Sequence, residues 1–143
     1  MPHVERKIEI HTPPNRIFDI LDDVSNSAKW SLPVNEITEI SKDKFSVKST
    51  VGDFTLIRTE TVEPEKFSMS IEGGIFNSMG YILNPKGDMV ETTIWGDFDD
   101  EKNEGVLAKA GEILLESLKS YAEFLEEGGN ADDFDKKQLM VSP

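Results

Sequence analysis

The longest helical pattern in the chain is GVLAKAGEILLESLKSYAEFLEE, residues 105–127. Residues 100–127 contain no proline, and apolar or small side chains recur at intervals of three and four. The recurring positions are Leu107, Ala110 with Gly111, Leu114, Leu118, Tyr121 with Ala122, and Leu125. This period predicts an amphipathic helix of about seven turns, about 40 Å long, that ends at Gly128-Gly129.

Upstream of this helix the side-chain pattern changes to period two, which is typical of β-strands. Strand patterns cover residues 3–11, 34–40, 45–51, 54–62, 66–72, 76–84 and 89–98. The links between the later strands are short, and Gly52-Asp53 predicts a two-residue hairpin turn. Short links join antiparallel neighbours, so the pattern predicts one seven-stranded antiparallel sheet.

Two short helical segments separate the first strand from the second. Thr12 predicts the N-cap of a helix over residues 13–22, with a proline in its first turn. The polar residues 22–29 predict a second short helix. Trp30 follows it, and we expect this side chain either to pack over the helix pair or to line the mouth of a pocket.

The order of these elements predicts an α+β fold in which a curved sheet wraps around the long C-terminal helix. The sheet must bury its apolar face, and only that helix is long enough to cover it. A wedge between them, closed at one end by the short helices, either fills with side chains or holds a small apolar ligand. We expect residues 1–128 to form this domain and residues 129–143 to form a flexible polar tail.

Four segments, 4–30 (VERKIEIHTPPNRIFDILDDVSNSAKW), 59–74 (TETVEPEKFSMSIEGG), 79–98 (MGYILNPKGDMVETTIWGDF) and 105–127, resemble the START-like superfamily, also called SRPBCC. This superfamily includes the birch pollen allergen and the polyketide cyclase/dehydrase groups. The resemblance covers about residues 3–127 and implies the helix-grip fold. It also implies binding of hydrophobic small molecules, although some members are cyclases or aromatases and others regulate chaperones.

Composition excludes several other classes of function. The 143 residues carry 15 basic and 28 acidic side chains, a net charge of −13, which disfavours nucleic-acid and anionic lipid partners. There is no cysteine, and the two histidines, His3 and His11, have no metal-ligand spacing, so we expect no metal and no cofactor. No signal peptide or membrane span is visible, which favours the cytoplasm.

The predicted hairpin pairs Val51 with Phe54 and Phe45 with Glu60, which places Arg58 and Glu60 on the apolar face of the sheet. A buried arginine needs a partner, so we expect Glu60 or an anionic ligand group to pair with it. The alternative is that both charges reach solvent at the rim. Around this pair we expect a ligand site formed by Phe54, Leu56, Phe67, Met69, Tyr81, Trp95, Ala110, Gly111, Leu114 and Leu118.

Two features of this predicted site stay open. The turn after residue 84 leaves the register of the last two strands undetermined, so Tyr81 and Trp95 fall on the same face or on opposite faces. Ala110 and Gly111 remove volume in mid-helix, which either lets the helix approach the sheet or leaves a void.

The function that we expect is binding of a small hydrophobic ligand, lipid, polyketide or isoprenoid-like, between the sheet and the last helix. No residue is assigned a catalytic role, so a non-catalytic binding protein is favoured. The first alternative is a cyclase, aromatase or dehydratase with a buried ionisable pair. The second is a protein-interaction module, such as a chaperone regulator, in which the wedge is filled. The sequence leaves open whether the chain forms a homodimer.

Overall fold

The computed structural model describes residues 2–136. One antiparallel sheet contains all seven strands in the order β1-β7-β6-β5-β4-β3-β2. The strands are β1 (His3–Ile10), β2 (Val34–Ser41), β3 (Lys44–Ser49), β4 (Gly52–Val62), β5 (Lys66–Glu72), β6 (Ser78–Lys86) and β7 (Met89–Asp97). The helices are α1 (Pro14–Asp22), α2 (Ser27–Trp30) and α3 (Glu104–Glu126), with short 3-10 turns at Val24–Asn26, Glu101–Asn103 and Ala131–Asp133. The predicted helix-grip fold is confirmed.

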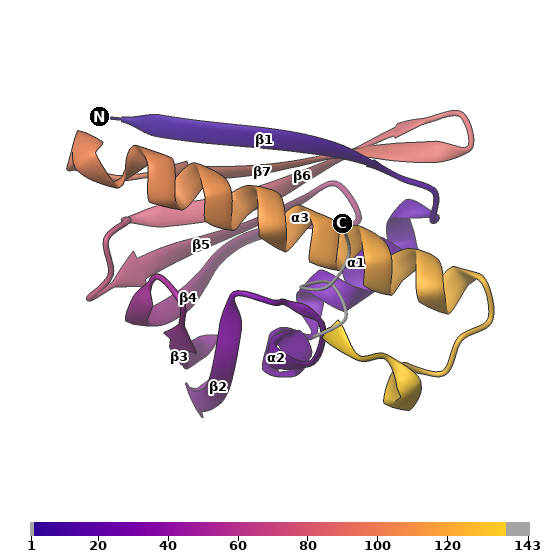
Figure 1. Cartoon of the computed structure of the whole chain (residues 1–143), viewed down its shortest axis with the longest axis horizontal. Coiled ribbons are helices and arrows are strands. Elements are labelled where there is room, and N and C mark those ends of the chain that lie inside the picture. The colour runs from indigo at the N-terminus through magenta and orange to yellow at the C-terminus, as the bar shows by residue number, and fades with distance from the viewer. Residues whose placement is uncertain (1, 137–143) are drawn as a thin grey trace.

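Helix α3 runs along one face of the sheet and packs mainly on β1 and β7 (Figure 1). Its C-terminal half also meets α1 and α2, and there its buried side chains gather: Leu115, Ser117, Leu118, Tyr121 and Ala122. Opposite them, the inner face of the sheet and α1 supply the rest of the core. The rings of Phe18 from α1 and Phe67 from β5, for example, form a T-shaped pair with centroids 6.3 Å apart. Part of the core therefore lies between α1 and the sheet, beside the C-terminal half of α3.

The β3–β4 hairpin turns two residues earlier than predicted. Ser49 pairs with Gly52, so Thr50 and Val51 form the turn, and Phe45 lies opposite Leu56 rather than Glu60. Gly52 has φ +106°, which suits the residue that follows a tight turn, as in a glycine bulge. The Ser49 hydroxyl supports the turn by donating to the Gly52 carbonyl over 2.7 Å. Because the shift is even, the predicted inner face of β3 is unchanged.

The N-terminus of α1 also differs from the prediction. Pro13, not Thr12, precedes the first helical turn, and no side chain caps the helix. Thr12 is buried instead, and within the described residues its hydroxyl has no hydrogen-bond partner.

The C-terminus of α3 matches the prediction. Gly128 adopts φ +96° and closes the helix end by donating to the Leu125 carbonyl over 3.1 Å.

Residues 131–136, within the segment expected to be a tail, make defined contacts. The Phe134 ring meets Tyr121 and Phe124 at centroid distances of 4.9 and 5.4 Å. Lys136 donates hydrogen bonds to the carbonyls of Ser31 and Val34 over 3.0 and 2.6 Å. Residues 137–143 of the expected tail lie outside the described residues.

Among the helices of residues 2–136, none has the length and apolar character needed to cross a membrane.

Gly80 lies where β6 meets β7, with Trp95 as its cross-strand partner. A Cβ atom at residue 80 would stand 2.6 Å from Cζ2 of Trp95 and 2.7 Å from the Phe67 carbonyl oxygen. Both distances are shorter than any van der Waals contact, and the carbonyl belongs to the backbone, which cannot turn aside. The sheet therefore needs glycine at this position.

We predict that Gly80→Ala lowers the free energy of unfolding by about 1–3 kcal/mol, the usual cost of overpacking. The measurement is urea unfolding followed by circular dichroism. Gly105→Ala in α3 is the control, because a Cβ there meets nothing within 4 Å and alanine favours a helix. Equal stability of Gly80→Ala and the wild type would contradict the close packing described here.

Candidate functional site

A cavity of about 130 Å³ lies between α3 and the inner face of the sheet. Its roof is formed by Leu107, Ala110, Gly111 and Leu114 of α3. Its floor comes from Val47, Leu56, Phe67, Met69, Tyr81 and Ile94 on five strands. Nearly all of the surface that borders it is apolar. Such a lining favours apolar molecules and offers few polar groups that could hold water.

The cavity extends toward the β2–β4 side of the sheet, away from the strands on which α3 packs. Half-buried apolar side chains border this side: Val34, Ile37, Val51, Phe54, Leu107 and Leu114. Because α3 rests mainly on β1 and β7, its N-terminal half leaves these side chains without a full cover. The cavity is therefore less covered on this side than on the β1–β7 side.

Gly111 of α3 faces Ile94 of β7. A Cβ atom at this position would lie 3.5 Å from Cγ2 of Ile94, an ordinary van der Waals contact. Gly111 and Ala110 both border the cavity. Of the two sequence alternatives, retained space is the one seen here, because a Cβ at residue 111 would fit without any shift.

The end of the cavity near α2 is formed by Trp30 and Ser31, which are 2% and 1% exposed. The Trp30 ring stacks on Tyr121 of α3, with centroids 6.4 Å apart and an interplanar angle of 10°. Ser117 of α3 accepts a hydrogen bond from the Leu32 amide over 3.2 Å. Trp30 therefore packs beside the helices, as the first of the two expectations describes, and it borders the α2 end of the cavity.

The structure places the twelve predicted site residues in three groups. Nine of them border the cavity: Phe54, Leu56, Phe67, Met69, Tyr81, Trp95, Ala110, Gly111 and Leu114. Leu118 is fully buried in the hydrophobic core but does not border the cavity. Arg58 and Glu60 are absent from the residues that border it. A ligand-binding role stays a prediction for each of them.

The guanidinium of Arg58 binds Asp22 of α1 rather than Glu60. Its Nη2 donates to the Asp22 carboxylate, and its Nη1 donates to the Asp22 carbonyl over 3.2 Å. Its Nε lies 3.7 Å from a carboxylate oxygen of Asp43, and its guanidinium carbon lies 4.9 Å from the centroid of the Phe67 ring. The side chain is only 20% exposed. Arg58 is therefore a clamp between α1 and β4, and the predicted Arg58–Glu60 pair is wrong.

A β-bulge explains the displacement of Glu60. Arg58 lies opposite Met69, but Glu60 lies opposite the next residue, Ser68, so one extra residue sits in β4. A bulge of this kind reverses which face the following side chains occupy. Glu60 consequently leaves the inner face and pairs with Lys66, with Oε1 and Nζ 2.9 Å apart.

Tyr81 and Trp95 lie on opposite faces of the sheet. Tyr81 is buried opposite Ile94, whose side chain meets α3, whereas Trp95 is the next residue along β7. The Trp95 ring stacks on His3 with centroids 6.1 Å apart. Trp95 borders the cavity from β7, but its ring lies on the outer face.

Sequence reasoning did not single out several residues that border the cavity. Ile94 and Met79 depend on the β6–β7 register, which the sequence left undetermined. Ser31 follows α2 and has no periodic signal. Val4 and Arg6 do carry a periodic signal, because the even-numbered side chains of β1 point inward. Arg6 is nevertheless the one charged residue among the otherwise apolar positions 4, 6, 8 and 10.

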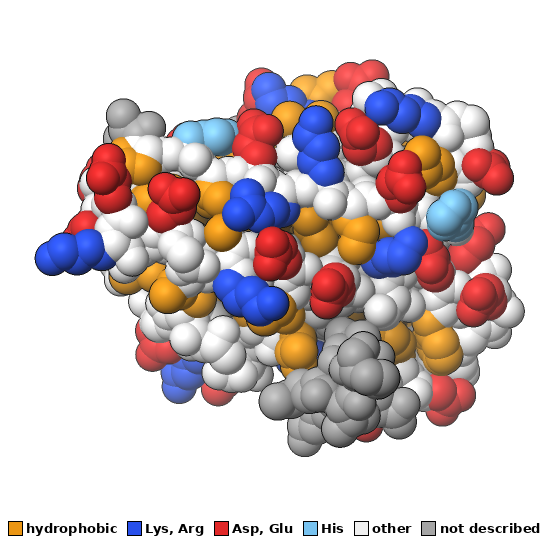
Figure 2. Space-filling view, turned by 45° about the horizontal axis from the view of Figure 1, so that its top comes forward, with side chains coloured by type: hydrophobic (Ala, Val, Ile, Leu, Met, Phe, Trp, Pro, Cys, Tyr) orange, Lys and Arg blue, Asp and Glu red, His pale blue; other side chains and the backbone are white. Residues whose placement is uncertain are grey.

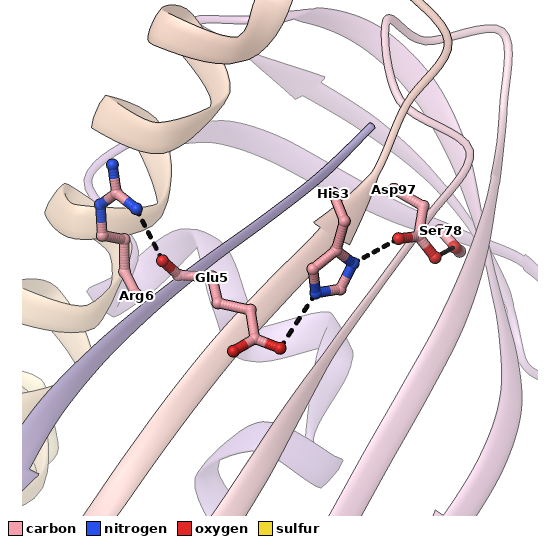
Figure 3. A network of polar contacts seen from close by, with 5 residues as sticks. All are labelled: His3, Glu5, Arg6, Ser78 and Asp97. Atoms are coloured by element: carbon pink, nitrogen blue, oxygen red, sulfur yellow. Dashed lines mark hydrogen bonds and ion pairs between the residues drawn. The ribbon is translucent and has the colours of Figure 1, made fainter. Parts of the chain in front are cut away.

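A polar network lies next to Trp95, whose ring stacks on His3. Figure 3 shows its members His3, Glu5, Ser78 and Asp97. His3 Nδ1 lies 2.5 Å from the Asp97 carboxylate, and its Nε2 lies 3.0 Å from the Glu5 carboxylate. Ser78 donates to the other oxygen of Asp97 over 3.1 Å. The hydrogen bond to Asp97, helped by the one to Glu5, raises the pKa of His3. This network ties β1, β6 and β7 together.

Acidic side chains outnumber basic ones in the sequence, and the two kinds are interspersed over the face that carries β1 and α3 (Figure 2). Several acidic groups are matched by ion pairs between elements, such as Glu112 of α3 with Arg6 of β1 over 3.2 Å. Within residues 2–136, no three histidine, aspartate or glutamate side chains gather closely enough to hold a metal ion.

We predict that Arg58→Met lowers the free energy of unfolding by about 1–3 kcal/mol, because the Asp22 carboxylate and carbonyl lose their charged donor. Lys66→Met, which breaks the more exposed pair with Glu60, should cost less than about 1 kcal/mol. Urea unfolding followed by circular dichroism measures both free energies. An Arg58→Met variant as stable as the wild type would contradict the clamp between α1 and β4.

Similar folds occur among solved structures. The protein XoxI from Bacillus cereus has 13% sequence identity and a TM-score of 0.75, covering 88% of this chain and 99% of that one. A START superfamily protein from Mycobacterium smegmatis has 12% identity and a TM-score of 0.70, covering 86% and 98%. The Zhui aromatase/cyclase from Streptomyces sp. R1128 has 16% identity and a TM-score of 0.70, covering 90% and 99%. At these identities the likeness shows the fold alone.

A comparison with curated protein sequences finds no match. The family described as "Polyketide cyclase / dehydrase and lipid transport" matches residues 1–123. That match spans the sheet and most of α3, and it agrees with the START-like fold. The chain belongs to the polyketide cyclase/dehydrase and lipid transport family.

Proposed function

We propose that the protein binds a small hydrophobic molecule in the cavity under α3. The observation that carries this proposal is an apolar space of about 130 Å³, bordered by half-buried apolar side chains on its β2–β4 side. Filling such a space removes ligand and protein surface from water, worth about 25 cal/mol per Å². Membership of a family that includes lipid transport and polyketide cyclases supports the same reading.

The size of the cavity limits the ligand. An engineered cavity of about 150 Å³ in another protein takes up benzene, whereas pockets for larger ligands span about 300–1,000 Å³. The cavity as it stands therefore suits one ring or a short branched chain. A lipid, polyketide or isoprenoid of greater length requires the N-terminal half of α3 to move away from β2–β4.

An enzymatic role needs an ionisable acid–base pair at the cavity. The candidates that border it are Tyr81, Glu5 and Arg6. Burial raises the pKa of Tyr81, so its phenol stays protonated at neutral pH. Glu5 is bound to His3 on the outer face, and Arg6 is paired with Glu112. Glu5 and Arg6 are thus paired with other side chains, and Tyr81 is uncharged. This arrangement favours a non-catalytic binding protein over a cyclase, aromatase or dehydratase.

The protein-interaction alternative predicts that side chains fill the space between the sheet and α3. A cavity of ligand size favours binding of a small molecule over that alternative. A cytoplasmic location stays a prediction from the sequence, and a homodimer stays open.

We predict that the wild type binds toluene and that Ala110→Leu binds it at least tenfold more weakly, because the added side chain fills the cavity from its roof. Gly105→Leu is the matched control: it adds a leucine to the same helix where a Cβ meets nothing within 4 Å, and its affinity should equal that of the wild type. Calorimetric titration gives the affinities, and the rise of the melting temperature with toluene gives a second readout.

Circular dichroism shows whether Ala110→Leu is folded. A folded Ala110→Leu variant that binds toluene as well as the wild type does, or a wild type that binds no apolar probe, would remove the proposal.

A further inference from the structure

Two buried polar groups at the α2 end of the cavity have no hydrogen-bond partner. Within residues 2–136, neither the Trp30 indole N–H nor the Ser31 hydroxyl makes a hydrogen bond. Both residues are at least 98% buried, and both border the cavity. Buried polar groups in folded proteins are nearly always paired, because an unpaired one costs free energy. Residues 2–136 therefore supply no hydrogen-bond partner for either of these two groups.

The protein holds the backbone around these groups firmly. Lys136 donates to the Ser31 carbonyl over 3.0 Å, and the Leu32 amide donates to the Ser117 hydroxyl over 3.2 Å. The Trp30 ring is stacked on Tyr121. The neighbouring polar groups are thus satisfied from the protein side, while the Trp30 N–H and the Ser31 hydroxyl are not. The space that Trp30 and Ser31 both border is the cavity.

The chemistry of the two groups defines what can pair with them. A tryptophan N–H can only donate, and a serine hydroxyl can donate or accept. A ligand oxygen with free lone pairs can accept from both. A ligand ammonium group carries donors only, so it would leave the Trp30 N–H unpaired.

The charges around the cavity and the net charge of the protein favour a neutral ligand. Arg6 is the one basic residue among the described residues that border the cavity, and it comes from β1 rather than from α2. Its Nε donates to Glu112 over 3.2 Å and its Nη1 donates to the Glu5 carbonyl over 2.7 Å. A net charge of −13 also repels anions. A carboxylate would therefore enter the α2 end without a cation to receive it.

We propose that the ligand is a neutral, mostly apolar molecule with a carbonyl or hydroxyl oxygen that accepts hydrogen bonds from Trp30 and Ser31. This inference rests on the binding function proposed above and specifies its ligand class. The apolar part fills the space under Ala110 and Gly111, and the oxygen points to the α2 end. Binding then relieves the two unpaired groups, so the protein prefers an oxygenated ring to a hydrocarbon of equal shape.

The test compares two isosteric probes, cyclohexanone and methylenecyclohexane, which differ only in an oxygen or a CH2 group at one ring position. The readout is the ratio of their affinities, measured by calorimetry or by ligand NMR. We expect Trp30→Phe and Ser31→Ala each to lower the ketone-to-alkene ratio about fivefold, the effect of one net hydrogen bond. Ser46→Ala is the matched control, because Ser46 is exposed on β3 and does not border the cavity. It should leave the ratio unchanged.

Proton–nitrogen NMR of the wild type gives a second measurement that needs no variant at Trp30. We expect cyclohexanone to move the Trp30 indole N–H signal downfield, and methylenecyclohexane to leave it in place. If methylenecyclohexane binds while the ratio and the N–H signal do not respond, this inference is overturned and the binding function stands. A resident water on Trp30 would give that same result. If neither probe binds, the proposed function fails and this inference fails with it.

Discussion

The packing of the C-terminal half of α3 against β1, α1 and α2 is the constraint on which the rest of the structure depends. Leu115, Leu118 and Ala122 are almost completely buried there, and Ser117 ties the helix to the segment after α2. This half anchors the helix, and the other half continues over the sheet. Along that other half stand small residues, and the curved sheet leaves space beneath them. The cavity is thus a consequence of how the helix is held.

The helix-grip fold could be predicted because its signals are periodic and local. The helical period of residues 105–127 and the period two of the strands do not depend on distant contacts. The inner faces of β3 and of the first part of β4 were predictable for the same reason. An error of two residues in the hairpin turn left those faces unchanged, since side chains alternate with that period.

The polar part of the site could not be predicted in this way. A single bulge in β4 moves Glu60 to the opposite face, and no residue type marks that bulge in the sequence. The partner of Arg58 is Asp22, 36 positions earlier, so it depends on how α1 docks onto the sheet. Trp30 and Ser31 stand at the end of a short helix without a periodic pattern. Their importance follows from tertiary burial without a partner, which only a structure reveals.

The most direct test of the central claim is a crystal structure of the protein under xenon pressure, because xenon enters dry apolar cavities without needing any polar contact. The account predicts a xenon atom between α3 and the sheet, beside Ala110, Gly111 and Ile94, with α3 anchored on β1 and β7. A structure in which Phe, Leu and Met side chains fill that space and no xenon is bound there would contradict it.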